Sequence, residues 1–356
     1  MAHQSTNVSM DDLRIDGMEI PINHAAKVLI YSNYVVAALG IPGNTLVILA
    51  VVLSNRVRNI STAFIVNLAI ADLLTCCVAP IFSWVQGYDY YDSILEPVCQ
   101  AVLVVVHSCI GASIYTLAAI AINRFFVIIA SRQLYEEIYQ SKYVAVQIAV
   151  IWIIPISVAV LPSFVFGIGQ QGYDFVLQTC APVKDHPTTV VFNDILTFVL
   201  YPIPLTAIIF CYVGILVKVI IHNRKLEKHG VTRTSGNPSN ENTQTRHEME
   251  AENTDSKKSN SARFTTIEIQ ISKNLFIIFL AYILCLTPQA ACTFFSCRID
   301  ENYTTHVVLF NSVVNPVIYG LKHPLYRQVF VCILRCRRVP EPSSFLRALM
   351  RRFERY

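Results

Sequence analysis

The sequence predicts an all-α membrane protein: a seven-transmembrane helix bundle with an amphipathic cytoplasmic helix after the seventh span. Of its 356 residues, 54% are hydrophobic and only 15% are charged, whereas soluble domains carry about 25% charged residues. The apolar residues fall in seven blocks, each near the roughly 20 residues that cross a bilayer. These blocks are Val28–Leu53, Ala63–Gln86, Val98–Ala130, Tyr143–Phe166, Val190–Ile221, Phe264–Phe295 and the more polar Thr304–Leu321.

The positive charges predict how the bundle is oriented. On one side of the predicted spans lie few basic residues, namely Arg14, Lys27, Lys184 and Arg298. On the other side lie Arg56, Arg58, Arg132, Lys142, the basic part of 222–263 and the C-terminal tail. Because cytoplasmic loops of membrane proteins carry the excess of Lys and Arg, we expect a multi-pass plasma-membrane protein with its N-terminus outside. A chain this apolar favours a lipid bilayer over nucleic acid as the partner of the basic tail.

Composition also divides the chain into segments. Residues 1–27 are polar and lack a signal peptide, so we expect an extracellular tail, with the first span of the 28–321 bundle acting as the insertion signal. The sequon Asn7-Val8-Ser9 makes Asn7 a candidate glycosylation site. Residues 222–263 are rich in polar and charged types, which predicts a disordered third cytoplasmic loop. Residues 337–356 are the cytoplasmic tail.

Residues 322–336 predict an amphipathic helix that lies on the membrane. Apolar residues recur on one face at helical spacing, and arginines are available to anionic headgroups. The apolar face consists of Leu325, Val329, Phe330 and Ile333. Cys332 and Cys336 are placed for palmitoylation, although unmodified thiols facing the core remain an alternative.

The cysteines outside the spans indicate a disulfide on the outer side. Most of the eleven cysteines fall within spans, but Cys99 opens the third span and Cys180 lies in the loop after the fourth. Both lie on the oxidising side by this topology. We expect them to pair and tie the loop over the mouth of the bundle, with Cys297 as a competing partner.

One acid stands near the middle of a span. A charged residue at membrane depth is costly and is therefore a candidate functional residue, and here it is Asp72. Polar residues at similar depth in other spans can surround it, namely Ser113, Asn311, Ser312 and Asn315. A carboxylate with hydroxyls and amides suits a small hard cation or a water cluster. A hydrogen-bonded network without an ion is the alternative.

Arg124 ends the third span near the cytoplasmic side, where it needs a partner. Glu268 is an acid at the same depth in the sixth span, and a pair between them would hold the two spans together. Pro288 supplies a kink about which the sixth span can swing. Tyr212 and Tyr319 lie near the inner face and are candidates to take over Arg124 in an open state.

In combination, these motifs resemble the rhodopsin-like (class A) G-protein-coupled receptors over about residues 28–336. The motifs are Gly43-Asn44, Leu68-Ala69 with Asp72, Cys99 with Arg124, Trp152, Pro204 with Tyr212, Cys285 with Pro288, and Asn315-Pro316 with Tyr319. The resemblance implies a ligand-operated receptor that activates heterotrimeric G proteins around Arg124 and has a sodium-type site at Asp72. It implies no other cofactor.

Within this class the chain is similar to the melatonin-receptor branch and related invertebrate orphan receptors. Asn123 replaces the usual Asp beside Arg124, as it does in that branch. Leu286 stands at the position of the usual sixth-span Trp, while Ser163 and Lys184 replace the Asn and Gln that melatonin receptors use. By analogy, the branch implies an inhibitory G protein, together with arrestin and receptor kinases as partners.

The resemblance also places a ligand pocket. Val106 stands where amine receptors have an Asp, so a protonated amine would need a different acid. Leu309 stands where opsins have their retinal-binding Lys. The predicted pocket residues are Val106, His107, Ile110, Ser163, Thr197, Leu200, Gln289, Thr293 and Thr305. This mostly apolar set favours an extracellular ligand that is a neutral small molecule, a lipid or a peptide, although His107 can equally be a satisfied core histidine.

Other function classes fit less well. A transporter or channel is the alternative reading, but it calls for charged or unwound segments along a path or for an internal repeat, and we find only Asp72. An intramembrane enzyme is excluded because no metal cluster or Ser-His pair occurs at useful depth.

Overall fold

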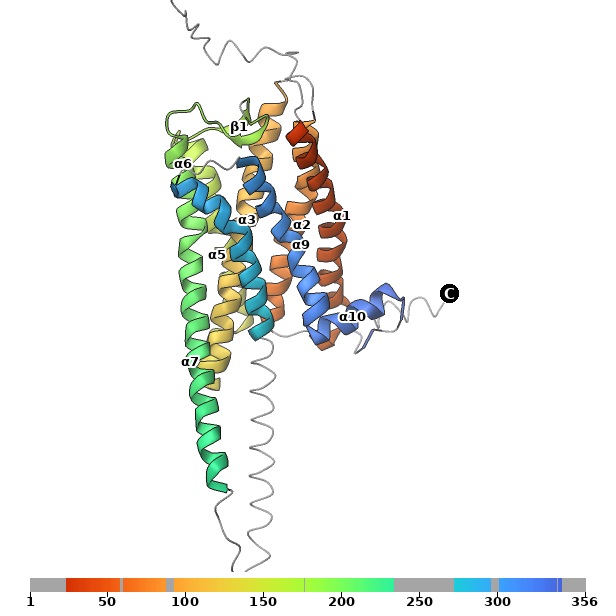
Figure 1. Ribbon diagram of the computed structural model, residues 1–356, viewed down its shortest axis with the longest axis vertical. Coiled ribbons are helices and arrows are strands. Elements are labelled where there is room, and N and C mark those ends of the chain that lie inside the picture. The colour runs from red at the N-terminus through yellow and green to blue at the C-terminus, as the bar shows by residue number, and fades with distance from the viewer. Residues whose placement is uncertain are drawn as a thin grey trace, which may run out of the picture.

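The computed structural model is a bundle of long helices that run along a common axis (Figure 1). It describes residues 24–57, 60–87, 93–175, 177–233, 272–295, 301–337 and 339–340. The helices are α1 (His24–Leu53), η2 (Asn55–Val57), α2 (Ile60–Gln86), α3 (Leu95–Ile129), α4 (Arg132–Ile138), α5 (Ser141–Val160), η3 (Leu161–Val165), α6 (Thr189–Leu200), α7 (Pro202–Arg233), the sixth span (Ser272–Phe295), α9 (Glu301–Lys322) and α10 (Pro324–Leu334). Two short strands, β1 (Gln171–Asp174) and β2 (Thr179–Pro182), lie at one end.

The described helices confirm the predicted fold class. Six of them are long and apolar enough to cross a membrane. The seventh predicted span is α9, whose 22 residues are long enough but include more polar side chains. Asn311, Ser312 and Asn315 of α9 are buried, so these polar groups face the inside of the bundle and not the lipid.

The fifth predicted span, Val190–Ile221, is confirmed as an apolar span over Thr189–Ile221. The structure divides it into α6 and α7 at Tyr201. Pro202 has no backbone N–H to continue the ladder of hydrogen bonds, and Tyr201 ends α6 by donating its own N–H to the Thr197 carbonyl at 3.0 Å.

The predicted disordered loop 222–263 also needs a correction at its start. Helix α7 continues as far as Arg233, because residues 222–233 include good helix formers such as Arg, Lys, Leu and Glu. Residues 234–263 lie outside the described part of the chain. The same is true of Asn7, Glu268, Cys297 and most of the predicted tails.

The strands β1 and β2 form an antiparallel hairpin, with Tyr173 opposite Cys180. The disulfide Cys99–Cys180 joins this hairpin to α3. The Glu96 carboxylate on the first turn of α3 accepts a hydrogen bond from the Tyr173 N–H at 3.1 Å. The hairpin is therefore fixed to α3 by a disulfide and a charged hydrogen bond. Figure 1 shows the hairpin at the top of the bundle. We call this the hairpin end.

Helix α10 lies across the opposite end of the bundle (Figure 1), which we call the α10 end. Its apolar face packs on the bundle, with Tyr326, Val329 and Phe330 buried. The sequence had placed this face toward the membrane. Instead, Leu334 on another face is 71% exposed. Cys332 of this helix is half-buried, whereas Cys336, which follows the helix, is exposed.

Helix α3 is the central element, packed against α2, α5, α7 and the hairpin. A glycine allows its closest approach to α5. A Cβ added at Gly111 would lie 2.5 Å from the Pro155 Cβ, closer than real carbon atoms approach. Gly111 therefore brings α3 close to α5, so that the side chains on the other faces of α3 reach α2, α7 and the sixth span.

Candidate functional site: a cavity, a buried carboxylate and a buried arginine

A cavity of about 440 Å³ lies at the hairpin end between α2, α3, β2, α6, the sixth span and α9. Eight of the nine predicted pocket residues line it, namely Val106, His107, Ile110, Thr197, Leu200, Gln289, Thr293 and Thr305. The exception is Ser163, which is not among the residues that line the cavity. Its hydroxyl donates to the Gly169 carbonyl at 3.1 Å because the chain turns back on itself after η3, so Ser163 holds the loop and does not line the cavity.

His107 is the most enclosed polar group of the cavity. Its ring packs edge-on against Phe192, with 6.4 Å between the ring centroids. Its Nδ1 atom is buried and has no hydrogen-bond partner in the described part of the chain. A fully satisfied core histidine would have both ring nitrogens engaged, whereas His107 has the Gln171 side chain as its one polar neighbour in the described chain.

Sequence reasoning missed several residues of the cavity wall, namely Gln86, Asn193, Asp194, Tyr201 and His306. The signal was present in the helical spacing of α6. Residues three or four apart share one face of a helix, so Thr197 implies Asn193, Asp194 and Tyr201 as neighbours on the face toward the cavity.

The Asp72 carboxylate lies deeper in the bundle and accepts hydrogen bonds from two other helices. Ser113 of α3 donates to Oδ1 at 3.1 Å, and the Asn315 amide of α9 donates to Oδ2 at 2.7 Å. All three residues are buried. Asn311 and Ser312 are buried on the same stretch of α9, and the Ser312 carbonyl accepts from Asn44 of α1 at 2.9 Å. In the described chain no hydrogen bond joins Asn311 to Asp72.

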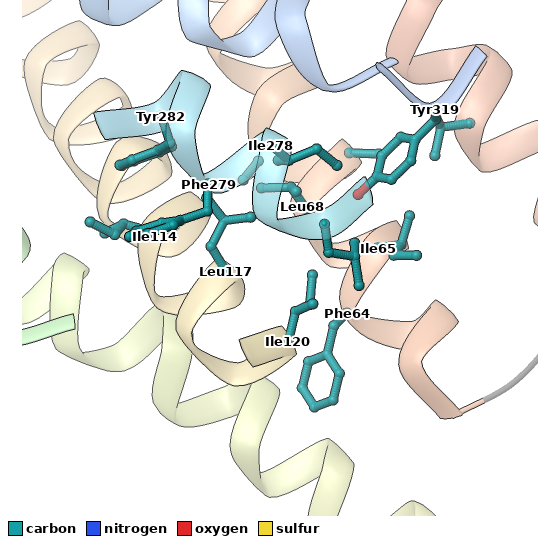
Figure 2. Close-up of a cluster of buried hydrophobic side chains, with 14 of the residues drawn as sticks. Phe64, Ile65, Leu68, Ile114, Leu117, Ile120, Ile278, Phe279, Tyr282 and Tyr319 are labelled. Atoms are coloured by element: carbon teal, nitrogen blue, oxygen red, sulfur yellow. The ribbon is translucent and has the colours of Figure 1, made fainter. Parts of the chain in front are cut away.

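An apolar layer lies along α3 between the level of Ser113, which contacts Asp72, and the level of Arg124. Figure 2 shows the side chains of this layer. It is built from α2, α3, the sixth span and α9, and its labelled members are Phe64, Ile65, Leu68, Ile114, Leu117, Ile120, Ile278, Phe279, Tyr282 and Tyr319. Along α3 the layer fills the interval between Ser113 and Arg124, which is about 16 Å of helix axis at 1.5 Å per residue. A continuous polar path, as a channel requires, is absent from this stretch of the described bundle.

Arg124 is buried at the α10 end, where it joins a hydrogen-bonded cluster. Its Nη2 donates to the Ser61 hydroxyl of α2 at 2.6 Å. Ser61 in turn donates to the Asn123 side-chain oxygen at 2.6 Å. The Asn123 amide then donates to the Tyr135 hydroxyl of α4 at 3.3 Å. We call Ser61, Asn123, Arg124 and Tyr135 the arginine cluster, and it ties α2, α3 and α4 together through neutral partners among the described residues.

Ser61 is a member of this cluster that sequence reasoning did not find. The sequence analysis looked for an acid to pair with Arg124 and selected Glu268, which lies outside the described residues. The described partner is a neutral hydroxyl that accepts from Arg124 and donates to Asn123. The sequence did contain a clue to this contact. Ser61 begins the second span at the same membrane depth at which Arg124 lies near the end of the third span.

The other predicted switch residues lie around the cluster. Tyr212 packs on the sixth span, with ring centroids 5.0 Å from Phe276 and 5.8 Å from Phe279. Tyr319 stacks on Tyr326 at 5.4 Å, and Figure 2 shows its hydroxyl pointing into the apolar layer. The described sixth span continues through Pro288 and Leu286 toward the hairpin end.

The positive charge of Arg124 also affects His323, which lies at the junction between α9 and α10. Burial, and then the positive charge of Arg124, lower the pKa of His323 from 6.5 to about 4. His323 is therefore neutral at physiological pH, which keeps a second positive charge away from the arginine cluster.

Comparison with known proteins places this geometry in a family. The family described as 7 transmembrane receptor (rhodopsin family) matches residues 43–319. The G-protein coupled receptor moody of Drosophila melanogaster is 27% identical over 86% of this chain, and the chain spans only 51% of that receptor's length. Human melatonin receptor type 1B is 26% identical over 84% of this chain and 76% of its own length.

A solved structure shows the same fold. Squid rhodopsin superposes with a TM-score of 0.70 over 91% of this chain and 90% of its own chain. At 18% identity this match carries the fold and nothing about the ligand. The named relatives are receptors and not enzymes, in agreement with the sequence analysis.

The arginine cluster predicts an energetic coupling between Ser61 and Asn123. A double-mutant cycle with Ser61→Ala and Asn123→Ala should give a coupling free energy of about 0.5–1.5 kcal/mol, because each single change removes the same hydrogen bond. The measurement is the unfolding of the purified protein in detergent.

The matched control uses Thr206, an exposed residue of α7 whose hydroxyl bonds within its own helix at 2.8 Å. Thr206→Val and Asn123→Ala should act additively. Equal additivity in the Ser61 cycle would contradict the cluster.

Proposed function

This chain belongs to the rhodopsin family of seven-transmembrane receptors, and on that basis we propose that it binds an extracellular ligand and activates heterotrimeric G proteins. The ligand occupies the cavity at the hairpin end, and the G protein engages the α10 end around Arg124. The observation that carries the proposal is the buried Arg124 in its cluster with Ser61, sealed from the cavity by the apolar layer.

The sixth span is the element that connects the two ends. Its outer half lines the cavity through Leu286, Gln289 and Thr293. Its inner half supplies Ile278 and Phe279 to the apolar layer. The receptor has one state in which the apolar layer is closed and one in which it is open, and the sixth span is tilted differently in each. A ligand that binds one state better increases the fraction of molecules in that state, by an amount set by its difference in affinity for the two. Pro288 weakens the helix ladder between the two halves.

The orientation follows from charge and redox chemistry. Described basic residues gather toward the α10 end, among them Arg132, Lys142, Lys273 and Arg327, whereas the hairpin end has Lys27 and Lys184. The Cys99–Cys180 disulfide lies at the hairpin end, and such bonds persist in oxidising surroundings. Both features support a plasma-membrane protein with the N-terminus and hairpin outside and the arginine cluster inside.

The likeness to melatonin receptors extends the proposal to an inhibitory G protein, and to arrestin and receptor kinases as later partners. Melatonin itself is not the ligand we propose. The Asn and Gln that melatonin receptors use are replaced by Ser163 and Lys184, and neither replacement is among the residues that line the cavity.

We also propose that Asp72 holds a sodium ion. The residues fit a hard cation, because the buried carboxylate lies beside the hydroxyls of Ser113 and Ser312. Asn311 is buried on the same stretch of α9. In the described chain no basic side chain pairs with Asp72. A bound cation there would offset the cost of the buried charge and stabilise the arrangement in which α2, α3 and α9 are packed together.

Arg124→Ala should abolish G-protein activation while surface expression is retained, because the variant removes the charge that the G protein meets when the layer opens. The measurement is a panel of G-protein activation reporters, read without ligand and with a ligand library. Arg335→Ala, which changes an exposed arginine after α10, is the matched control and should signal normally. Unchanged signalling by Arg124→Ala would refute the mechanism.

Sodium should raise the melting temperature of the purified receptor relative to potassium at equal ionic strength. A site that binds only the folded state contributes about 1.4 kcal/mol at a sodium concentration ten times Kd. Asp72→Asn should remove the difference between the two salts, while Asp185→Asn, an exposed loop carboxylate, should keep it. Equal sodium and potassium effects in the unmodified receptor would count against the site.

A further inference from the structure

Among the described residues, one carboxylate lines the cavity, that of Asp194. The described part of the wall includes neither lysine nor arginine. The cavity is otherwise apolar or neutral, with His107 and His306 as its titratable neighbours. In a space with little water, one uncompensated negative charge dominates the electrostatic potential.

Asp194 belongs to the face of α6 that looks into the cavity. Val190, Asp194, Thr197 and Tyr201 all line it, and their spacing of three or four residues is that of one helical stripe. Phe192 lies on another face and is buried in an apolar cluster with Leu196 and Leu200, which anchors the helix beside the cavity. The orientation of Asp194 is therefore set by the packing of the whole helix and does not depend on a loop.

The Asp194 carboxylate is accessible and has no partner in the structure. Its residue is exposed, and in the described chain it makes no hydrogen bond or ion pair. An ionisable residue within a membrane-crossing helix is costly to keep. A free carboxylate on the wall of a cavity is thus available to a ligand group of opposite charge.

Two further acceptor atoms in the cavity wall lack donors. The Gln86 amide nitrogen donates to Thr179 at 3.2 Å, but its Oε1 atom is buried with no partner in the described chain. The Nδ1 atom of His107 is in the same condition. Buried polar atoms of this kind are normally satisfied, so the cavity offers hydrogen-bond acceptors to a molecule that brings donors.

From this arrangement we infer that the cavity takes a ligand with a protonated amine, and that Asp194 is the counter-ion that determines this specificity. The inference rests on the proposed receptor function and names its ligand class. It revises our expectation of a neutral ligand, which followed from Val106. Val106 removes an acid from α3, but Asp194 supplies one from α6 on the facing wall.

The Asp194 carboxylate and the acceptor atoms of Gln86 and His107 are expected to contact different parts of the ligand. The ammonium group donates charge-assisted hydrogen bonds to the Asp194 carboxylate. Its apolar body packs against Leu103, Val106 and Leu309. A hydroxyl or amide N–H on that body reaches the free acceptors of Gln86 or His107.

The test measures binding to the purified full-length receptor in lipid nanodiscs by ligand-induced thermal stabilisation. The probes are a library of arylalkyl primary amines, each paired with its neutral N-acetyl derivative. Amines should stabilise the receptor and their acetylated partners should not. Asp194→Asn should weaken the apparent affinity about 10- to 100-fold, the usual loss when a hydrogen bond to a charged group is removed.

Two variants keep the result interpretable. Asp194→Glu retains the charge and should restore amine binding, which separates loss of charge from loss of folding. Asp185→Asn removes an exposed carboxylate of the neighbouring loop that does not line the cavity, and it should leave amine affinity within about twofold.

The outcomes separate this inference from the proposed function. Acetylated members that bind as well as their amines, an Asp194→Asn receptor with unchanged amine affinity, or a library in which no amine binds would each overturn the inference. Binding needs no G protein, so Asp194-dependent amine binding without nucleotide exchange would support the inference while contradicting the proposed function. Activation by neutral members alone would do the reverse.

Discussion

The burial of charge between apolar helices is the constraint on which this structure depends. Removing an ion from water costs several kcal/mol unless partners replace the lost hydration. Asp72 meets this cost with donors from α3 and α9, and Arg124 meets it through Ser61 of α2. Each charge therefore requires helices that are distant in sequence to remain in contact. Because the two charges lie at different depths, they fix the bundle at two levels, and the apolar layer between them keeps the levels separate.

This arrangement makes the sixth span the movable part. It contributes to the cavity and to the apolar layer, yet among described residues it makes no hydrogen bond to Asp72 or Arg124. Its polar links within the described chain go to other residues, such as Tyr282 to the Ile110 carbonyl at 3.3 Å and Thr287 to Tyr201 at 2.8 Å. The helices that hold the charges are thus tied to one another, while the sixth span is held mainly by apolar contact, which is non-directional and allows sliding.

The sequence was enough to predict the fold because membrane spans can be identified by their length and apolar composition. The α9 span contains more polar residues, but the motif Asn315-Pro316 identified it. Asp72 was equally evident, since few acids occur at that depth. Features that depend on particular contacts were harder to predict from the sequence. The break in the fifth span comes just before Pro202, and Pro204 does not end a helix because both prolines stand in the first turn of α7, where no backbone N–H is needed. Ser61 is an ordinary residue whose role depends on a contact with Asn123, 62 positions away. Asp194 was overlooked because the search for an acid followed α3, and only the cavity shows that α6 faces the same space.

The central claim is that the apolar layer opens when the sixth span moves away from the helices that hold Arg124. The most direct measurement is the distance between spin labels on Lys142 of α5 and Lys273 of the sixth span, two exposed positions at the α10 end. Double electron–electron resonance would measure this distance in the receptor alone and in the receptor bound to nucleotide-free heterotrimeric G protein. We expect the distance distribution to shift to longer values in the complex. An unchanged distribution in a complex that still exchanges nucleotide would contradict the account.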